Sequence, residues 1–186
     1  MSIRRFAEDL TKALSQRPLP KSFLNEQDFE QAFIVPLAAE IVARYSTVLL
    51  YTHPFGNMTC CSPKCTAISP VNSGRVLGCP KCWAASKAWA SVAAFGTHHT
   101  FDLVAKDDSH TLAVELKMVI VKGGRMPNGE IQRFLGQCSL AATKHTIVIG
   151  VFGYRGILNN KWRRDTDAVT KTLEGQNVHL VFRGIE

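Results

Sequence analysis

Two apolar stretches separated by a short polar turn constrain the fold more than any other feature of this sequence. Residues 97–106 and 110–121 are rich in β-branched and other apolar side chains, and Asp107, Asp108 and Ser109 lie between them. Strands of this composition joined by a polar turn favour an antiparallel hairpin. We therefore expect the two stretches to be neighbouring strands of one sheet.

The segments around this hairpin alternate between helix and strand patterns. Asn25 is suited to cap a helix in which large apolar side chains recur every four residues as far as Tyr45. Pro36 lies within this helix and is expected to kink it. The other predicted elements are a strand at 46–53, a short helix at 83–95, a helix at 130–144, a strand at 145–153, a helix at 165–174 and a strand at 178–182. This order predicts an α/β fold with a central mixed sheet flanked by helices.

The length and apolar content are those of one compact domain. With 186 residues, 46% of them hydrophobic, the chain can bury one sizeable core, so we expect residues 1–186 to form a single domain. Residues 1–24 hold a short amphipathic stretch that the prolines of QRPLPKS should end, and we interpret them as an N-terminal arm. Residues 54–83 are predicted to be a loop-rich insertion.

The charge of the chain favours a polyanionic partner. Lys and Arg number 22 against 15 Asp and Glu, which gives a net charge of +7. From Ile41 to Phe101 there is no acidic residue at all. Apolar runs of the roughly 20 residues that span a bilayer are missing, and the N-terminus has acidic residues where a signal peptide has an apolar core. We expect a cytoplasmic protein with no membrane partner.

Two charged residues interrupt an otherwise apolar strand. Side chains alternate in LAVELKMV, so Glu115 and Lys117 share one face. Their burial is costly unless they pair or bind an ion. The hairpin would bring Asp102 alongside Glu115, and two carboxylates can hold Mg²⁺ or Mn²⁺ against a phosphate while a lysine assists the attacking water. The pattern predicts phosphodiester cleavage; the alternative is a salt bridge between Glu115 and Lys117 on a half-exposed sheet.

At this point the sequence resembles a known family. Phe101-Asp102, twelve intervening residues and Glu115-Leu116-Lys117 are similar to the signature of the PD-(D/E)XK nuclease superfamily, which includes many restriction endonucleases. Phenylalanine replaces the proline of that signature. The family's core order of helix, three strands, helix and strand also resembles the order predicted from Asn25 to Gly153. The resemblance implies a restriction-endonuclease-like core around the mixed sheet.

The resemblance implies further site residues. Members of the family commonly supply an acidic residue from the first helix, and Glu26 and Glu30 stand one turn apart there; we favour Glu30. A glutamine or basic residue often begins the helix after the Glu-x-Lys strand, and Gln132 fits that position. The implied catalytic set is Glu30, Asp102, Glu115, Lys117 and Gln132.

The implied protein is a Mg²⁺- or Mn²⁺-dependent nuclease, a DNA endonuclease of restriction or defence type. Many enzymes of this kind cut both strands as homodimers, so a homodimer is a further expectation. The alternative function is a non-catalytic, zinc-containing, nucleic-acid-binding subunit of a larger complex.

Five of the six cysteines lie between Cys60 and Cys82. Cys79 and Cys82 have the two-residue spacing of a zinc knuckle, and Cys65 pairs with either Cys61 or Cys60 upstream. Four thiolates leave no open position on zinc, so we predict a structural Zn²⁺ site that stabilises the insertion. Its favoured ligands are Cys61, Cys65, Cys79 and Cys82. The sixth cysteine, Cys138, is expected to be a buried apolar residue of a helix.

Several cations are candidates for contact with nucleic acid. Lys64 and Lys81 lie within the two presumed zinc knuckles, where an ordered basic loop could hold a phosphate backbone. Arg125 follows the charged strand. Arg163 and Arg164 lie beside Trp162, directly before the helix predicted at 165–174. The alternative interpretation is a solvated basic surface.

Overall fold

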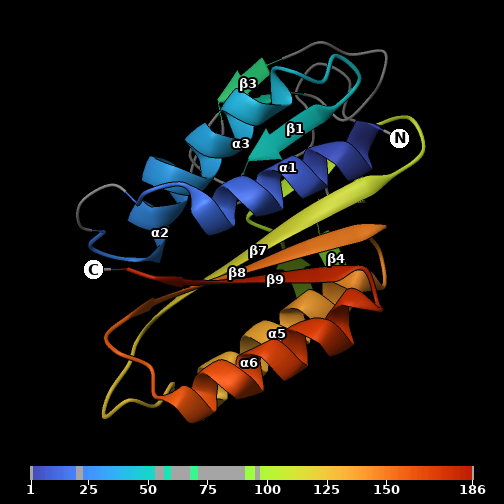
Figure 1. The fold of residues 1–186 in the computed structure, drawn as a ribbon. Coiled ribbons are helices and arrows are strands. Elements are labelled where there is room, and N and C mark those ends of the chain that lie inside the picture. The colour runs from blue at the N-terminus through green and yellow to red at the C-terminus, as the bar shows by residue number, and fades with distance from the viewer. Residues whose placement is uncertain are drawn as a thin grey trace.

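The computed structural model describes residues 2–19, 23–52, 57–59, 68–70, 91–94 and 97–185. Within them, a five-stranded sheet lies between two layers of helices (Figure 1). Its strands, in spatial order, are β1 (Leu49–Thr52), β6 (Leu103–Lys106), β7 (Thr111–Ile120), β8 (Ile147–Arg155) and β9 (Val178–Gly184). β1 pairs with β6, and β6 with β7, in antiparallel register, whereas β7, β8 and β9 run parallel to one another. The predicted α/β class with a mixed sheet flanked by helices is confirmed.

The predicted hairpin is also confirmed, because β6 and β7 pair in antiparallel register. Its turn is held by Asp107, whose Oδ1 accepts hydrogen bonds from the backbone N–H groups of Ser109 and His110 at 3.0 and 2.8 Å. Asp107 Oδ2 accepts from Ser2 and Ile3 at the start of the first helix. Burial opposes ionisation, but these donors outweigh it and lower the pKa of Asp107.

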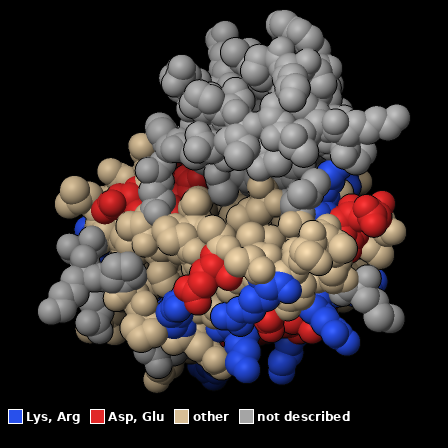
Figure 2. All heavy atoms as spheres, turned by 90° about the horizontal axis from the view of Figure 1, so that it is seen from above, with Lys and Arg blue, Asp and Glu red and all other residues tan. Residues whose placement is uncertain are grey.

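The first helix, α1 (Ser2–Gln16), packs across one face of the sheet (Figure 1). Phe6, Leu10 and Leu14 are fully buried along its apolar side and join the core cluster that covers this face. The segment interpreted as an N-terminal arm therefore includes a helix that is part of the core. On the outer side of the molecule, seen in Figure 2, basic and acidic side chains are interspersed along the edge that α1 forms.

The helix predicted after Asn25 consists of three parts. These are α2 (Glu26–Phe29), a π-helical turn η1 (Glu30–Ile34) and α3 (Val35–Val42). Asn25 caps the first part, since its side chain accepts a hydrogen bond from Asp28 N at 2.8 Å. Pro36 has no N–H, and its ring would clash with the carbonyl four residues earlier in a regular helix. A wide turn before the proline avoids this clash, so the expected kink is a π-helical turn.

Two helices cover the opposite face of the sheet, α5 (Asn128–Ala142) and α6 (Asn160–Glu174) (Figure 1). α6 begins five residues before its predicted start, because Asn159 caps it by accepting a hydrogen bond from Trp162 N at 3.0 Å. α5 approaches β8 closely at Gly150, where a Cβ atom would lie 2.7 Å from Cys138 Sγ. Cys138 is buried as expected.

Two small antiparallel sheets occur outside the central one. One pairs β2 (Asn57–Thr59) with β3 (Ile68–Pro70), and the other pairs β4 (Ser91–Ala94) with β5 (Thr97–Thr100). The helix predicted at 83–95 is therefore wrong at residues 91–94, where strand pairing overrides the helix propensity of alanine.

The remaining residues of that predicted helix lie outside the described part of the chain. So do Cys60, Cys61, Cys65, Cys79 and Cys82, together with Lys64 and Lys81. In the part that is described, we find no helix both long enough and apolar enough to cross a membrane.

Candidate active site

The candidate site lies where β6 ends beside β7. β6 pairs with only the first four residues of β7, and among the described residues no strand pairs with the rest of that edge, which we call the open edge of β7. The N–H groups of Leu116 and Met118 point toward the open edge, because alternate N–H groups of a strand face the same neighbour. Asp102 Oδ2 accepts from Leu116 N at 2.7 Å, and Glu26 Oε2 accepts from Met118 N at 2.8 Å. Two carboxylates thus accept the hydrogen bonds that a neighbouring strand would otherwise accept.

Acidic side chains are crowded at this edge. The last residue pair of the hairpin is Leu103 with Val114, so Asp102 comes next to Glu115. Glu115 and Glu30 are buried, with exposed fractions of 2% and 6%. Burial, and then the charges of Glu115 and Glu30, raise the pKa of Asp102 well above its usual range. The sequence-predicted Glu30, Asp102 and Glu115 therefore interact electrostatically, and we call them the acidic cluster.

Glu30 has a buried carboxylate oxygen, Oε1, that no described residue satisfies with a hydrogen bond. Burial, followed by the charge of Glu26, raises the pKa of Glu30 from 4.5 to about 7. A carboxyl in such surroundings favours either a proton or a cation.

Lys117 lies on the same side of β7, two residues beyond Glu115, and is held by two other acids. Its Nζ is 3.4 Å from Glu26 Oε2 and 3.3 Å from Glu130 Oε2. Burial alone would lower the pKa of Lys117, but the charges of Glu26 and Glu130 outweigh it, so the pKa is raised. The side chain is therefore an ammonium group.

Sequence reasoning left open whether Glu26 or Glu30 belongs to the site, and the structure brings both to this edge of β7. Glu26 contacts Lys117, while Glu30 lies in the buried acidic group. Glu130 was not anticipated, although it stands in the first turn of the helix that follows the Glu-x-Lys strand. Gln132, expected there instead, is exposed on α5, and none of its described contacts joins the cluster.

The donor set can be tested for its fit to a metal ion. Among the residues that the structure describes, no three Asp, Glu, His or Cys side chains are grouped so that they could hold a metal together. Mg²⁺ commonly binds through only one or two carboxylates and completes its coordination with water and phosphate oxygens. Asp102 and Glu115 are such a pair, and the unpartnered Oε1 of Glu30 is a further hard oxygen. The residues therefore fit Mg²⁺ or Mn²⁺ in their chemistry.

The remaining predicted nucleic-acid contacts lie outside the acidic cluster. Arg125 is exposed on the loop between β7 and α5, and Arg164 is exposed on α6. Arg163 also lies on α6, but its side chain is not among those described.

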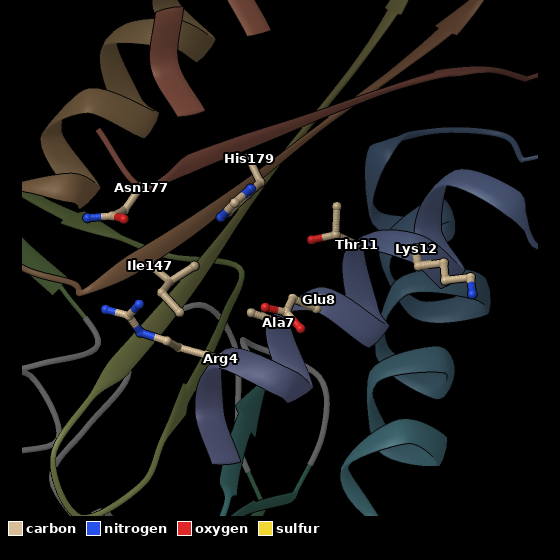
Figure 3. Close-up of a pocket in the computed structure, with 8 residues that line it drawn as sticks. All are labelled: Arg4, Ala7, Glu8, Thr11, Lys12, Ile147, Asn177 and His179. Atoms are coloured by element: carbon tan, nitrogen blue, oxygen red, sulfur yellow. The ribbon is translucent and has the colours of Figure 1, made fainter. Parts of the chain in front are cut away.

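A separate hollow lies between α1 and the beginnings of β8 and β9, with a volume of about 440 Å³ (Figure 3). Thr11 and Glu8 line it from α1, Ile147 from β8 and His179 from β9. None of its lining residues belongs to the acidic cluster, so this hollow is not the candidate active site.

Comparison with known proteins adds no family to these observations. No protein-family model matches the sequence, and no significant match is found among characterised proteins or among solved structures.

Proposed function

We propose that the chain is a nuclease that uses a divalent metal ion to hydrolyse phosphodiester bonds, with DNA as its substrate. The observation that carries the proposal is the gathering of Glu30, Asp102 and Glu115 at the open edge of β7, with Lys117 beside them. An antiparallel hairpin followed by α5 and the parallel strand β8 supports a restriction-endonuclease-like core.

Electrostatic repulsion is the physical reason to expect a cation here. Burial and the charges of Glu115 and Glu30 raise the pKa of Asp102, so a buried carboxylate is disfavoured there, and a divalent ion would reverse that preference. Asp102 and Glu115 would hold the ion. When bound, Mg²⁺ or Mn²⁺ would polarise the scissile phosphate and favour deprotonation of water.

The protein groups have separate roles in this proposal. Glu30 would accept the proton of the attacking water, because a carboxyl with a pKa of about 7 can both take up and release a proton near neutral pH. Lys117 would act as a cation that stabilises charge on the phosphate oxygens, since Glu26 and Glu130 keep it protonated. The water oxygen forms the new bond to phosphorus as the bond to the leaving oxygen breaks.

A structural zinc ion bound by Cys61 (or Cys60), Cys65, Cys79 and Cys82 remains part of the proposal, together with a homodimer. Elemental analysis of the purified protein should find one zinc per chain, and Cys79→Ser should lose it. Zinc in equal amount in the variant would contradict this assignment.

A non-catalytic, nucleic-acid-binding subunit is the second candidate. Two observations favour it: Lys117 is already engaged by Glu26 and Glu130, and no three described side chains form a ready metal site.

Cleavage assays separate the two candidates. Plasmid, linear and single-stranded DNA, and RNA, are incubated with the protein and Mg²⁺ or Mn²⁺, with chelator as the blank. We expect cleavage by the wild type and a loss of at least about a hundredfold in Asp102→Asn and Lys117→Ala. Asp108→Asn is the matched control, because Asp108 is an exposed turn carboxylate. Failure of the wild type to cut any substrate with either metal would overturn the nuclease proposal.

A further inference from the structure

Two loops next to the candidate site form one surface. The first connects β7 to α5 and makes a tight turn at Gly123 and Gly124, both with positive φ. The second connects β8 to α6. Val121 N donates to Arg155 O at 2.7 Å, and Asn159 N donates to Gly124 O at 3.3 Å. These hydrogen bonds fix the loops against each other.

The charged side chains of these two loops are all positive. Residues 116–129 and 146–164, which include both loops, contain no Asp or Glu. The cations there are mostly exposed, and we name them the basic loop surface: Lys122, Arg125, Arg155, Lys161 and Arg164. Arg155 is half-buried, and its Nε has no hydrogen-bond partner among the described residues. An anionic ligand would supply that partner.

Two large aliphatic side chains project from the same loops. Ile120 is 60% exposed at the end of β7, and Ile157 is 84% exposed on the second loop. Ile120 is paired with Arg155, which precedes Ile157 by two residues. The adjacent Leu158 is buried and anchors the loop. Exposed isoleucines among cations suit a ligand that is both anionic and apolar.

The surface is also near the acidic cluster. Ile120 follows Lys117 by three residues of extended strand, which is about 10 Å. Side chains alternate along β7, so Ile120 and Lys117 point to opposite faces, and a nucleic-acid strand would pass around the open edge of β7 to bring a neighbouring phosphate to Lys117.

We propose that the basic loop surface binds single-stranded DNA, with phosphates on its cations and unpaired bases against Ile120 and Ile157. Bases in a regular duplex are stacked on one another, so an aliphatic side chain reaches their faces only by unstacking them at a cost, whereas unpaired bases present their faces without that cost. This inference rests on the proposed nuclease function and names its substrate class, DNA with unpaired bases.

The test measures binding without cleavage. The full chain in chelator is titrated into labelled single-stranded DNA, blunt duplex and single-stranded RNA at several salt concentrations, with fluorescence anisotropy as the signal. We expect tighter binding to the single strand than to the duplex, and a loss on the order of tenfold in Lys122→Glu/Arg125→Glu. Arg4→Glu/Arg5→Glu is the matched control, since both arginines are exposed on α1.

The apolar part has its own variants. Ile157→Ser should weaken single-strand binding about fivefold while leaving duplex binding unchanged, and Ile157→Leu should retain both. Melting curves establish that each variant is folded. If the charge-reversal variant Lys122→Glu/Arg125→Glu does not fold, the neutral variant Lys122→Gln/Arg125→Gln takes its place.

The outcomes distinguish this inference from the nuclease proposal. Equal losses in the loop and α1 variants, tighter binding to the duplex, or a preference for RNA would overturn the assignment of single-stranded DNA to this surface. Single-strand binding that needs the loop cations, in a protein that cuts nothing with Mg²⁺ or Mn²⁺, would retain the surface and reject the nuclease. Cleavage that is unaffected by the loop variants would retain the nuclease proposal and reject the role of the basic loop surface.

Discussion

The ammonium of Lys117 lies 3.3 Å from Glu130 Oε2, an ion pair that joins the middle of β7 to the first turn of α5. Glu26, on α2, places its Oε2 atom 3.4 Å from the same ammonium nitrogen. α2 and α5 lie on opposite faces of the sheet (Figure 1), so Lys117 connects the two helical layers beside the acidic cluster.

Replacing Glu130 should free Lys117 for a phosphate. In Glu130→Gln one competing charge is lost, so we expect DNA to bind up to about fivefold more tightly, as suits a partly exposed ion pair. The free energy of unfolding should change by less than about 1 kcal/mol. Anisotropy titrations and urea unfolding measure the two effects, with Glu174→Gln, at the far end of α6, as the control. Weaker DNA binding by Glu130→Gln would contradict this role.

Glu30 should contribute stability to the metal-free protein that is lost as pH rises from about 4.5 to about 7, whereas the lowered pKa of the buried His145 contributes with the opposite sign. The pKa of Glu30 is about 7 in the folded chain against an ordinary 4.5, so the folded state binds more protons in this interval. Deprotonation of the buried Glu30 therefore destabilises the folded state relative to the unfolded chain, in which the same carboxylate is solvated. Urea unfolding in chelator at pH 5 and pH 8 measures the difference.

Glu30→Gln should remove the Glu30 contribution, while the raised pKa of Asp102 keeps a contribution of the same sign and the lowered pKa of His145 keeps one of the opposite sign. Glu8→Gln, an exposed change on α1, should leave the pH dependence as in the wild type. An unchanged slope in Glu30→Gln would exclude Glu30 as its source.

Divalent cations should stabilise the protein through Asp102 and Glu115. A ligand that binds only the folded state at about a hundred times its dissociation constant adds about 2.7 kcal/mol. Mg²⁺ or Mn²⁺ should therefore raise the melting temperature of the wild type, more at pH 8 than at pH 6, because bound protons must leave first. Asp102→Asn should lose the effect and Asp108→Asn should keep it. An equal rise in both variants would place the cation elsewhere.

Gly150 should be required for the packing of α5 on β8. A Cβ atom there would lie 2.7 Å from Cys138 Sγ and 2.8 Å from Phe134 Cζ, so Gly150→Ala is expected to destabilise the fold by about 1–3 kcal/mol. Gly136→Ala, on α5 with no atom within 4 Å of the added Cβ, should instead stabilise it by up to about 1 kcal/mol. Thermal unfolding compares them, and similar effects would refute the close approach.

Local patterns determined much of the fold. The polar turn at Asp107 and the alternation in β7 were sufficient to predict the hairpin that brings Asp102 beside Glu115, because register follows from the turn and from a side-chain period of two. Asn25 marked the start of a helix because capping depends on residues three apart.

Only the tertiary structure decided which side chains meet across elements. Glu26 reaches Lys117 from a helix far earlier in the chain, and Glu130 reaches it from the helix that follows β7. α1 enters the core because the sheet offers it an apolar face, and residues 91–94 form a strand because a partner strand is present. Neither long-range packing nor strand pairing is encoded in a local period, so these features emerge only when the whole chain is folded.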